Sequence, residues 1–319
     1  MITVIFASRN GAQVLERTLE SLARARAPRG GWKLIAVDNA STDNTFEILK
    51  SFEARLPLTV LQEGVPGKNR SLNKALEIAQ GDFYVFCDDD VIVAPDWLEA
   101  WRKAADEQTD FDLFAGSTLP HWPSETPDWV RAEVNQDLVF GTNSGLKEGP
   151  CEATAMYGTN MALRSEIFAK GVRFNPDIGP TSSASYPMGS ETELARRLDA
   201  LGYKAYACAG AVVEHIIRPS QMDREYTLLR AYRWGRGLAH MKVPHSYEPG
   251  VLSRKNVLRW LLYPLLLPVV THKEAWARQW EWAIDQGYED GWRETQGLEQ
   301  RWRGSRSGPL VAARYRGSR

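Results

Sequence analysis

A continuous apolar run ends in three consecutive aspartates at Phe83-Tyr84-Val85-Phe86-Cys87-Asp88-Asp89-Asp90. A short apolar run without polar alternation is typical of a β-strand that is covered on both faces. In sheets of this kind, ligands bind at the carboxyl ends of the strands. The segment therefore predicts a buried strand that delivers three carboxylates to a binding site.

Similar apolar runs lie upstream, and they alternate with segments whose apolar residues recur at helical spacing. We expect strands over residues 3–7, 33–37, 58–61 and 83–87, and helices over residues 15–22, 46–52, 69–79 and 95–105. Strands that alternate with helices at this spacing predict an α/β fold, in which a mostly parallel sheet is covered by helices on both faces.

The composition excludes some classes of protein. The 319 residues include 39 basic and 40 acidic side chains, and this balance argues against a general nucleic-acid-binding protein, which needs clustered basic charge. Cys87, Cys151 and Cys208 lie far apart, which indicates reduced thiols and a cytoplasmic location. No signal peptide and no apolar run long enough to span a bilayer is evident, so we expect a soluble or peripherally attached protein.

The aspartates at positions 88–90 point to a divalent cation. Adjacent carboxylates repel one another, and a bound cation relieves that repulsion. Their hard oxygen ligands suit Mg²⁺ or Mn²⁺. The alternative is a loop of solvated acids that caps the next helix, although Asp96 is better placed for that role.

A second acidic turn follows the strand over residues 33–37. It reads Asp38-Asn39-Ala40-Ser41-Thr42-Asp43. Residues of these types often form turns and helix N-caps, so a purely structural role remains open. Together with the aspartate triplet, the turn predicts two acidic clusters on the same edge of one sheet.

In their order and spacing, several motifs between residues 2 and 240 resemble the family-2 glycosyltransferases, which are inverting enzymes with the GT-A fold. The resemblance implies a catalytic domain over residues 1–245, with a nucleotide-sugar half over about 1–115 and an acceptor half over about 116–245. Residues 246–319 would form an aromatic-rich helical extension with a basic tail.

Four segments resemble the parts of that family that bind the nucleotide sugar. They are Ala7-Ser8-Arg9-Asn10, which departs from the more usual Thr-Tyr-Asn, and residues 37–43, 67–73 and 88–90. The resemblance implies that Asp90, in the DXD motif, binds the metal ion, Mn²⁺ or Mg²⁺. It also implies that the following residues contact the nucleotide sugar: Ala7, Ser8, Asn10, Asp38, Lys68, Asn73, Asp88 and Asp89.

Two further segments resemble the acceptor side of the family. Tyr157-Gly158-Thr159-Asn160-Met161-Ala162 is similar to its acceptor-side strand, which implies Asn160 in acceptor binding. Gly189-Ser190-Glu191-Thr192-Glu193-Leu194 falls where the family carries a Glu-Asp pair, and Glu191 takes the place of the Asp that serves as catalytic base. The residues themselves also allow a capping box from Ser190 and Glu193, with Glu191 complementing the helix dipole.

His215 and Arg218 follow another apolar run. The resemblance implies that His215 completes the metal site. Arg218 is a candidate for binding the diphosphate, because guanidinium matches phosphate geometry. A histidine packed in the core and a solvated cation remain the structural alternatives.

The resemblance implies inverting transfer of a sugar from a nucleotide sugar, with UDP preferred over GDP or dTDP, to an acceptor hydroxyl in polysaccharide, glycan or glycolipid synthesis. Glu191 would accept the proton of that hydroxyl. One alternative is a sugar nucleotidyltransferase, which should carry a Gly-rich phosphate loop that Ser8-Arg9-Asn10-Gly11 does not supply. The other is a non-catalytic nucleotide-sugar-binding protein, which could dispense with Glu191.

Residues 121–150 break the strand–helix pattern, and long excursions of this kind are usually functional. We expect this segment to line the acceptor site, with Trp122 and Trp129 as platforms for a sugar ring. The alternative is that both tryptophans anchor the segment to the core.

The C-terminal region is rich in apolar and aromatic residues. Residues 257–270 are almost wholly apolar, and six arginines but no acid lie from Arg301 to the end. Between them, an aromatic stripe recurs every four residues at Trp276, Trp280, Ile284 and Tyr288. These features predict contact with the inner face of a membrane and a saccharide or lipid-linked acceptor. Packing on the catalytic domain or a homodimer interface is the alternative.

Overall fold

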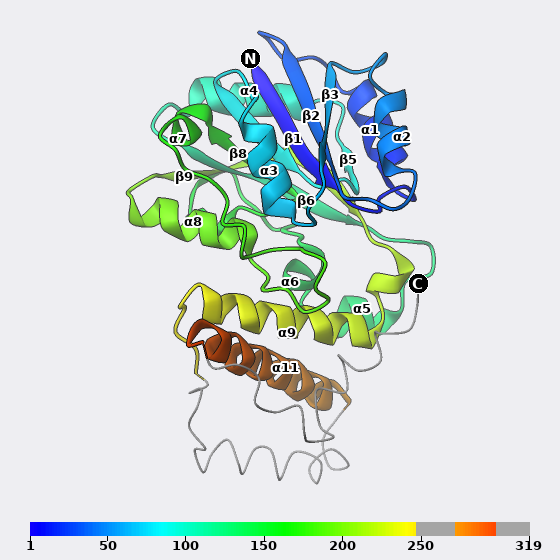
Figure 1. The fold of residues 1–319 in the computed structure, drawn as a ribbon, viewed down its shortest axis with the longest axis vertical. Helices are drawn as coiled ribbons and strands as arrows, with labels where there is room; N and C mark the ends of the chain where they lie inside the picture. The colour runs from blue at the N-terminus through cyan, green and yellow to red at the C-terminus, as the bar shows by residue number, and fades with distance from the viewer. Residues whose placement is uncertain (247–271, 298–319) are drawn as a thin grey trace. The chain divides into compact units, whose positions relative to one another are not determined.

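The computed structural model describes residues 1–246 and 272–297 and is built around one nine-stranded sheet (Figure 1). The strands run in the order β3-β2-β1-β4-β8-β6-β9-β5, and β7 pairs with β9. Their bounds are β1 Ile2–Ser8, β2 Trp32–Asn39, β3 Leu58–Glu63, β4 Phe83–Cys87, β5 Val91–Val93, β6 Leu113–His121, β7 Gly149–Cys151, β8 Asn160–Arg164 and β9 Ala205–Ile216.

The helices of the described residues are α1 Leu15–Arg24, α2 Thr45–Ser51, α3 Lys68–Leu76, α4 Trp97–Glu107, α5 Asp128–Glu133, α6 Gln136–Phe140, α7 Ser165–Ala169, α8 Ser190–Ala200, α9 Arg224–His240 and α11 His272–Thr295. Two short 3₁₀ turns, Ala153–Ala155 and Pro219–Gln221, complete the described elements.

The first four strands in sequence form the parallel part of the sheet. β1 pairs in parallel with β2 and β4, and β2 pairs in parallel with β3. The register sets Ser8 beside Asp38 and Asp38 beside Gln62, so the carboxyl ends of β1, β2 and β3 lie on one edge. The rest of the sheet is mixed, because β8 is antiparallel to both β4 and β6.

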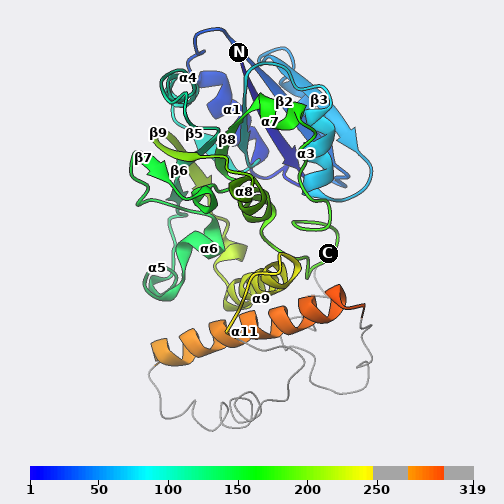
Figure 2. The same ribbon diagram turned by 90° about the vertical axis from the view of Figure 1, so that its left-hand side faces the viewer.

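Strands β1, β2 and β4 are buried on both faces over most of their length, as their apolar sequences predict, whereas β3 at the end of the sheet is partly exposed. Val4 and Phe6 pack with α1 and α4 through Leu15, Leu19 and Trp97. On the opposite face, Ile5 and Phe86 belong to a cluster that includes residues of α3 and α8 (Leu72, Leu194 and Leu198). Figure 2 shows α1 and α4 on one side of these strands and α3 on the other. The predicted α/β fold with a mostly parallel sheet is confirmed.

The chain divides into two compact units. Unit 1 consists of residues Met1–Glu125, Phe140–Thr181 and Ser190–Arg218, and it contains the whole sheet. Unit 2 consists of Thr126–Val139, Ser182–Gly189 and the chain from Pro219 onward. The units therefore do not follow the expected boundary after residue 245. The reason is that α9, expected in the catalytic domain, packs against α11.

Close backbone contact joins α9 to α11 (Figure 1). A Cβ atom on Gly235 would overlap the carbonyl oxygen of Ile284, and one on Gly287 would overlap the carbonyl oxygen of Tyr232. The aromatic stripe of α11 faces this contact. Trp276 and Tyr288 are buried, and Trp280 and Ile284 pack against the α9 cluster that contains Leu229 and Tyr232. The stripe thus packs on the protein itself, as the structural alternative proposed.

Three further expectations are revised or lie outside the described residues. The excursion over residues 121–150 is not wholly irregular, since it contains α5, α6 and the first residues of β7. The helix expected to begin at Pro95 begins at Trp97. Residues 257–270 and the arginine-rich tail fall outside the described part of the chain. Within that part, no helix is both long enough and apolar enough to cross a membrane.

Candidate active site

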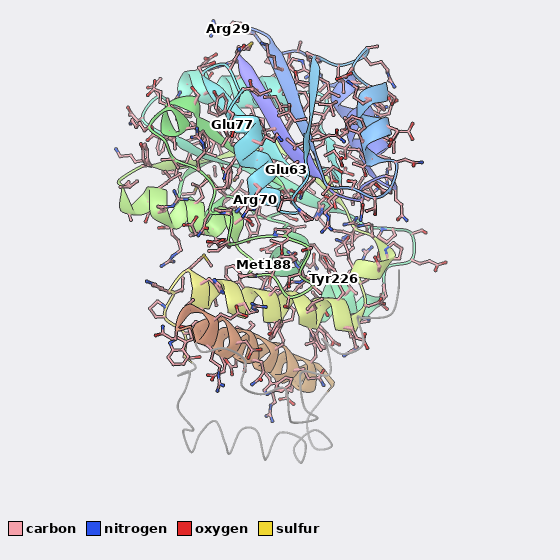
Figure 3. The ribbon with its side chains drawn as sticks, viewed as in Figure 1. Arg29, Glu63, Arg70, Glu77, Met188 and Tyr226 are labelled. Carbon is pink, nitrogen blue, oxygen red and sulfur yellow. The ribbon has the colours of Figure 1, made fainter. Side chains whose placement is uncertain are left out.

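The aspartate triplet lies between two strands that run in different directions. β4 brings the chain to Asp88, and β5 pairs antiparallel with β9, with Val91 opposite His215. This pairing explains why His215, distant in sequence, lies beside Asp90. Figure 3 labels Glu63 on β3 and Arg70 on α3, which belong to unit 1, as the aspartate triplet does.

Asp88 forms an ion pair with Lys68, the first residue of α3. Both side chains are largely buried, with 20% of Lys68 and 22% of Asp88 exposed. Burial alone would lower the pKa of Lys68, but the nearby Asp88 and Glu191 carboxylates outweigh it and raise that pKa. Lys68 is therefore a fixed positive charge beside the triplet.

Asp89 accepts a hydrogen bond from the hydroxyl of Ser8 at the end of β1. A Cβ atom on Gly11 would overlap both the Ser8 hydroxyl and the Asp89 carboxylate, so this contact requires a glycine at position 11. Burial and the charge of Asp90 raise the pKa of Asp89 to about 7, although the Ser8 hydrogen bond acts in the opposite direction.

Asp90 is 6% exposed, and each of its oxygens meets a cationic or ionisable side chain. His215 Nε2 lies 3.1 Å from Oδ1, and Arg218 Nη2 lies 3.2 Å from Oδ2. Burial opposes ionisation of Asp90, but His215 and Arg218 outweigh it and lower its pKa to about 2. Asp90 is thus an ionised carboxylate in a largely buried position.

The ring nitrogen of His215 that faces away from Asp90, Nδ1, fixes the orientation of the imidazole. Nδ1 lies 2.5 Å from the carbonyl oxygen of Phe140, which directs Nε2 toward Asp90. A histidine that donates one ring N–H to a backbone carbonyl presents its other nitrogen to a ligand or an acid. Burial would lower the pKa of His215, but the carboxylate of Asp90 raises it.

Asn10 and Asp38 lie where β1 and β2 end, on the same edge of the sheet. Asp38 is buried, its Oδ1 accepts from the backbone N–H of Ser41 at 3.3 Å, and Gln62 Nε2 lies 3.5 Å from Oδ2. Asn10 Oδ1 accepts from the N–H of Thr42 at 2.8 Å. The turn after β1, which contains Asn10, is thus bonded to the turn after β2, which contains Thr42. Both turns lie next to Ala7 and Ser8 on β1.

Glu191 is the second residue of α8 and lies near Lys68. A Cβ atom built on Gly158 would lie 3.5 Å from both Glu191 Oε2 and Lys68 Nζ. Gly158 therefore lies close to both a carboxylate and an ammonium group. Glu193 directs both carboxylate oxygens to Arg197, at 3.1 and 3.0 Å, rather than back to the start of the helix.

Two predicted binding residues have their polar groups committed elsewhere. Asn160 is 0% exposed, donates to the carbonyls of Ser117 and Ala211, and accepts from Trp97. A side chain without exposed surface cannot touch an acceptor in this structure, so its role here is to hold strands together. Asn73 bonds the N–H and the carbonyl of Phe174, at 2.9 and 2.8 Å, which ties α3 to a following loop.

The two tryptophans expected in the acceptor site belong to different units. Trp122 packs edge-on against Phe140 in unit 1, with ring centroids 5.3 Å apart. Trp129, in unit 2, packs edge-on against Trp276 at 5.4 Å, and the Arg224 guanidinium lies over both rings. These contacts correspond to the anchoring alternative, and the stacking role stays a prediction.

The donor set fits a hard divalent cation. Asp90 and His215 are a carboxylate and an imidazole within 3.1 Å of each other. Mg²⁺ and Mn²⁺ sites in phosphate-transfer enzymes often use one or two protein ligands and complete their shell with phosphate oxygens and water. Among the described residues there is no group of three or more His, Cys, Asp or Glu side chains arranged to hold an ion, so Asp90 and His215 would need those outer ligands.

The geometry also gives roles to residues that the sequence did not single out. A Cβ atom on Gly11 would overlap the Ser8 hydroxyl and the Asp89 carboxylate, and Asn39 Oδ1 accepts from the N–H of Gly67 at 2.9 Å, just before Lys68. A glycine after a strand is a weak signal by itself, since most such glycines serve turns. No sequence pattern shows that Gly11 will lie against Ser8 and Asp89, or Gly158 near Lys68 and Glu191.

The model of glycosyl transferase family 2 matches residues 3–171, more than half of the chain. The chain belongs to glycosyl transferase family 2. The membership inferred from the motifs is thereby confirmed, and the matched region contains Ser8, Asp38, Lys68 and the aspartate triplet.

Curated relatives agree with this family. The succinoglycan biosynthesis protein ExoM of Rhizobium meliloti (strain 1021) is 30% identical over 170 residues, which are 52% of this chain and 52% of ExoM. The poly(ribitol-phosphate) β-N-acetylglucosaminyltransferase TarS of Staphylococcus aureus (strain Mu50 / ATCC 700699) is 33% identical over 33% of this chain and 19% of TarS. The chain thus matches about half, or less, of the length of these family-2 relatives.

Solved structures share the fold. The mannosyltransferase PcManGT from Pyrobaculum calidifontis, in complex with GDP-Man and Mn²⁺, has a TM-score of 0.56 at 20% identity, over 95% of this chain and 76% of that one. TarS residues 1–349 from S. aureus, in complex with UDP-GlcNAc, has a TM-score of 0.52 at 16% identity, over 93% and 92%. At these identities the likeness concerns the fold of this family-2 chain.

Proposed function

We propose that the chain is an inverting, metal-dependent glycosyltransferase that moves a sugar from a UDP-sugar to an acceptor hydroxyl in the synthesis of a polysaccharide, glycan or glycolipid. The observation that carries the proposal is that Lys68 and Glu191 both lie close to Gly158, while Lys68 pairs with Asp88, two residues before the Asp90 that pairs with His215. Positive charge for a diphosphate and a carboxylate for a hydroxyl proton thus occur in one unit.

The residues divide the work by charge. Asp38 and the Asn10 turn would contact the base and ribose, and Lys68 and Arg218 would face the diphosphate, whose negative charge grows as the sugar leaves. Asp90 and His215 would hold the Mn²⁺ or Mg²⁺ ion, which supplies Lewis-acid stabilisation of that charge. The oxygen of the acceptor hydroxyl would bond to the anomeric carbon as the bond from that carbon to the diphosphate breaks. Glu191 would take the proton that the hydroxyl loses.

The nucleotide and the metal ion are proposed from two lines of support. TarS is described with UDP-GlcNAc and PcManGT with GDP-Man and Mn²⁺. The carboxylate–imidazole pair suits the same class of ion. A sugar nucleotidyltransferase is disfavoured, because no Gly-rich phosphate loop follows β1. A non-catalytic binding protein would bind the same donor without turnover.

The proposal is tested by thermal unfolding in the presence of UDP, GDP, dTDP and their sugars, with and without Mn²⁺. A ligand that binds only the folded state at 100 times its Kd stabilises that state by about 2.7 kcal/mol. We expect UDP with Mn²⁺ to give the largest shift and Asp38→Ala to reduce it. Release of UDP from UDP-GlcNAc, UDP-glucose or a related donor then tests catalysis. Binding without any turnover would favour the non-catalytic alternative.

Attachment to the inner face of a membrane, with a lipid-linked acceptor, is proposed from the sequence alone. The apolar residues 257–270 and the basic tail carry this proposal, and the aromatic stripe of α11 does not, because it packs on α9. Flotation of the full chain with anionic liposomes at low salt is the expected result. Failure to float would leave a saccharide as the acceptor class.

A further inference from the structure

Residues 174–181 form a strap between two helices of unit 1, α3 and α8. At its α3 side, the backbone N–H of Lys68 donates to the carbonyl of Pro180 at 2.9 Å, and Gly67 bridges Thr181. Asn73 bonds the strap where it begins, at Phe174. The strap thus lies over the first turns of the helix that carries Lys68.

Asn69 makes the central attachment of the strap. It is 2% exposed, and its Nδ2 donates to the carbonyls of Asn175 and Ile178, both at 2.7 Å. One amide therefore holds two points of the strap, next in sequence to the lysine that pairs with Asp88. An amide buried to this degree and bonded to two backbone carbonyls fixes the loop that carries them.

Gly179 makes the contact with the other helix. Its φ is +108°, and a Cβ atom there would overlap the hydroxyl of Ser190 and lie 3.6 Å from Asn69 Nδ2. Ser190 is the buried first residue of α8, and Glu191 is the second. The strap therefore touches the residue before the proposed base at the same point where Asn69 holds it.

The two helices held by the strap carry charges that must be near each other without joining. Glu191 Oε2 and Lys68 Nζ each lie 3.5 Å from the Cβ position of Gly158. Lys68 is hydrogen-bonded to Asp88. Glu191 raises the pKa of Lys68 through its charge alone, without a hydrogen bond. A base that formed a direct ion pair with the lysine would be a weaker proton acceptor, so the spacing of the helices matters for the proposed reaction.

We infer that Asn69 and Gly179 are positioning residues, which act through the strap to set the distance between Glu191 and the Lys68–Asp88 pair. The inference rests on the proposed function, because it assigns a purpose to the placement of Glu191. It adds that the base is positioned from the donor-binding helix α3, so that the two halves of the site are assembled together.

A double-mutant cycle on UDP release from UDP-GlcNAc, in the full chain with Mn²⁺, tests the inference. We expect Asn69→Ala to lower kcat roughly 10- to 100-fold, since small misplacements of a catalytic group have effects of this size. The Kd for UDP should change by less than about twofold, because Asp38 and its turn are untouched. In a Glu191→Gln background, Asn69→Ala should have little further effect on kcat, because the residue through which it acts is already disabled.

Asn143→Ala is the matched control. Asn143 also ties a loop through two backbone bonds, accepting from the N–H of Thr118 at 2.6 Å and donating to the carbonyl of Gly116 at 2.9 Å, but it does not touch the strap. Any loss of kcat in this control should be fully additive with Glu191→Gln. Additive behaviour of Asn69→Ala would overturn the inference, whereas full activity of Glu191→Gln alone would overturn the assignment of the base.

Hydrogen exchange provides a measurement that needs no substrate. Asn69→Ala should speed exchange in the strap and in the first turn of α8, and leave the β6 peptides unchanged. Gly179→Ala should act similarly, and removing the Ser190 hydroxyl in Gly179→Ala/Ser190→Ala should restore part of the protection. A loosened strap with unchanged exchange in α8 would show that the strap does not hold the helix, and would overturn the inference even if Asn69→Ala is too unstable for kinetics.

Discussion

In unit 1, charged side chains from separate strand ends pair with one another around residues 88–90, whereas in unit 2 most arginines of α9 bind backbone carbonyls and aromatic rings. Arg233 donates to the carbonyl of Ala184 at 2.8 Å and lies over the ring of Tyr186. Arg230 donates to the carbonyl of Leu138, and Arg224 lies over two tryptophan rings. The charges of unit 1 converge on a site, and those of unit 2 hold separate chain segments together.

The arginine contacts of unit 2 involve chain segments that return to unit 1. Unit 2 gathers residues 126–139 and 182–189, both of which leave unit 1 and return to it, onto the α9–α11 pair. Met188, labelled in Figure 3, donates its backbone N–H to the carbonyl of Arg233 at 3.0 Å. The second of these segments leads directly into α8. Arginines that bind carbonyls are suited to holding such loops, because five donors diverge from one planar group.

The largest expected effect is on the charges of unit 1. Asp90→Ala should lower metal-dependent UDP release by at least roughly 10³-fold, because it removes the proposed metal ligand and leaves His215 and Arg218 without their carboxylate. Turnover and Mn²⁺ binding would be measured alongside circular dichroism. Asp96→Ala, at an exposed acid before α4, should retain activity. Undiminished turnover in EDTA would remove the metal ion from the proposed mechanism.

The next effect separates the packing of the two units. Gly287→Ala should destabilise unit 2 by about 3 kcal/mol or more, because a Cβ atom there meets the backbone carbonyl of Tyr232, which cannot rotate away. The matched control is Gly64→Ala in unit 1, where a Cβ atom meets nothing within 4 Å. Denaturant unfolding followed by tryptophan fluorescence gives both values. Equal stability of the two variants would contradict the close helix contact.

The parallel half of unit 1 could be predicted because each strand is a local apolar run, and because parallel strands bring their carboxyl ends to one edge. Asp38 and the aspartate triplet were identified for this reason, whereas Ser8 was identified from the family resemblance. The mixed half was less accessible to sequence analysis. Val91–Val93 is too short to stand out, yet its pairing with β9 sets His215 beside Asp90.

Unit 2 could not be predicted, because it is assembled from three segments of the chain that carry no common pattern. The stripe on α11 has the same residues whether it faces a lipid surface or another helix. Only the glycines of α9 and α11, which allow the two helices to approach closely, indicate that the partner is another helix. Each of these glycines is a weak signal in sequence. Asn160 illustrates the converse error, since its motif resembles a binding strand although the side chain is fully buried.

A smaller effect tests whether Trp129 anchors or binds a sugar. Trp129→Ala should lower the free energy of unfolding by about 2–3 kcal/mol, because it removes a ring from the contact with Trp276 and Arg224. Trp129→Phe should lose less, since it keeps an aromatic face for the guanidinium. Unfolding by urea would be compared with the KM for the acceptor. An increased KM at unchanged stability would favour the sugar-stacking role instead.

The smallest effect concerns an ion pair between α9 and α11, Arg236 with Glu294, whose arginine also binds a loop. Arg236, 9% exposed, pairs with Glu294 and donates to the carbonyl of Ser185, and His240 Nε2 lies 3.2 Å from the same carboxylate. Burial opposes ionisation of Glu294, but His240 and Arg236 lower its pKa below the ordinary value of 4.5. We expect Glu294→Gln to cost about 1–2 kcal/mol at pH 7, a value reduced by the partial exposure of the carboxylate.

The sign of the pH dependence follows from that lowered pKa. The unfolded chain takes up a proton on Glu294 at a higher pH than the folded chain does, so the ion pair contributes fully above pH 4.5. Its contribution is lost as the pH falls from 4.5 toward the folded-state value. The difference in unfolding free energy between wild type and Glu294→Gln should therefore shrink as the pH falls below 4.5. A difference that stays constant down to pH 3 would mean that the negative charge of Glu294 does not hold Arg236. Packing and uncharged hydrogen bonds would then hold the loop on the two helices.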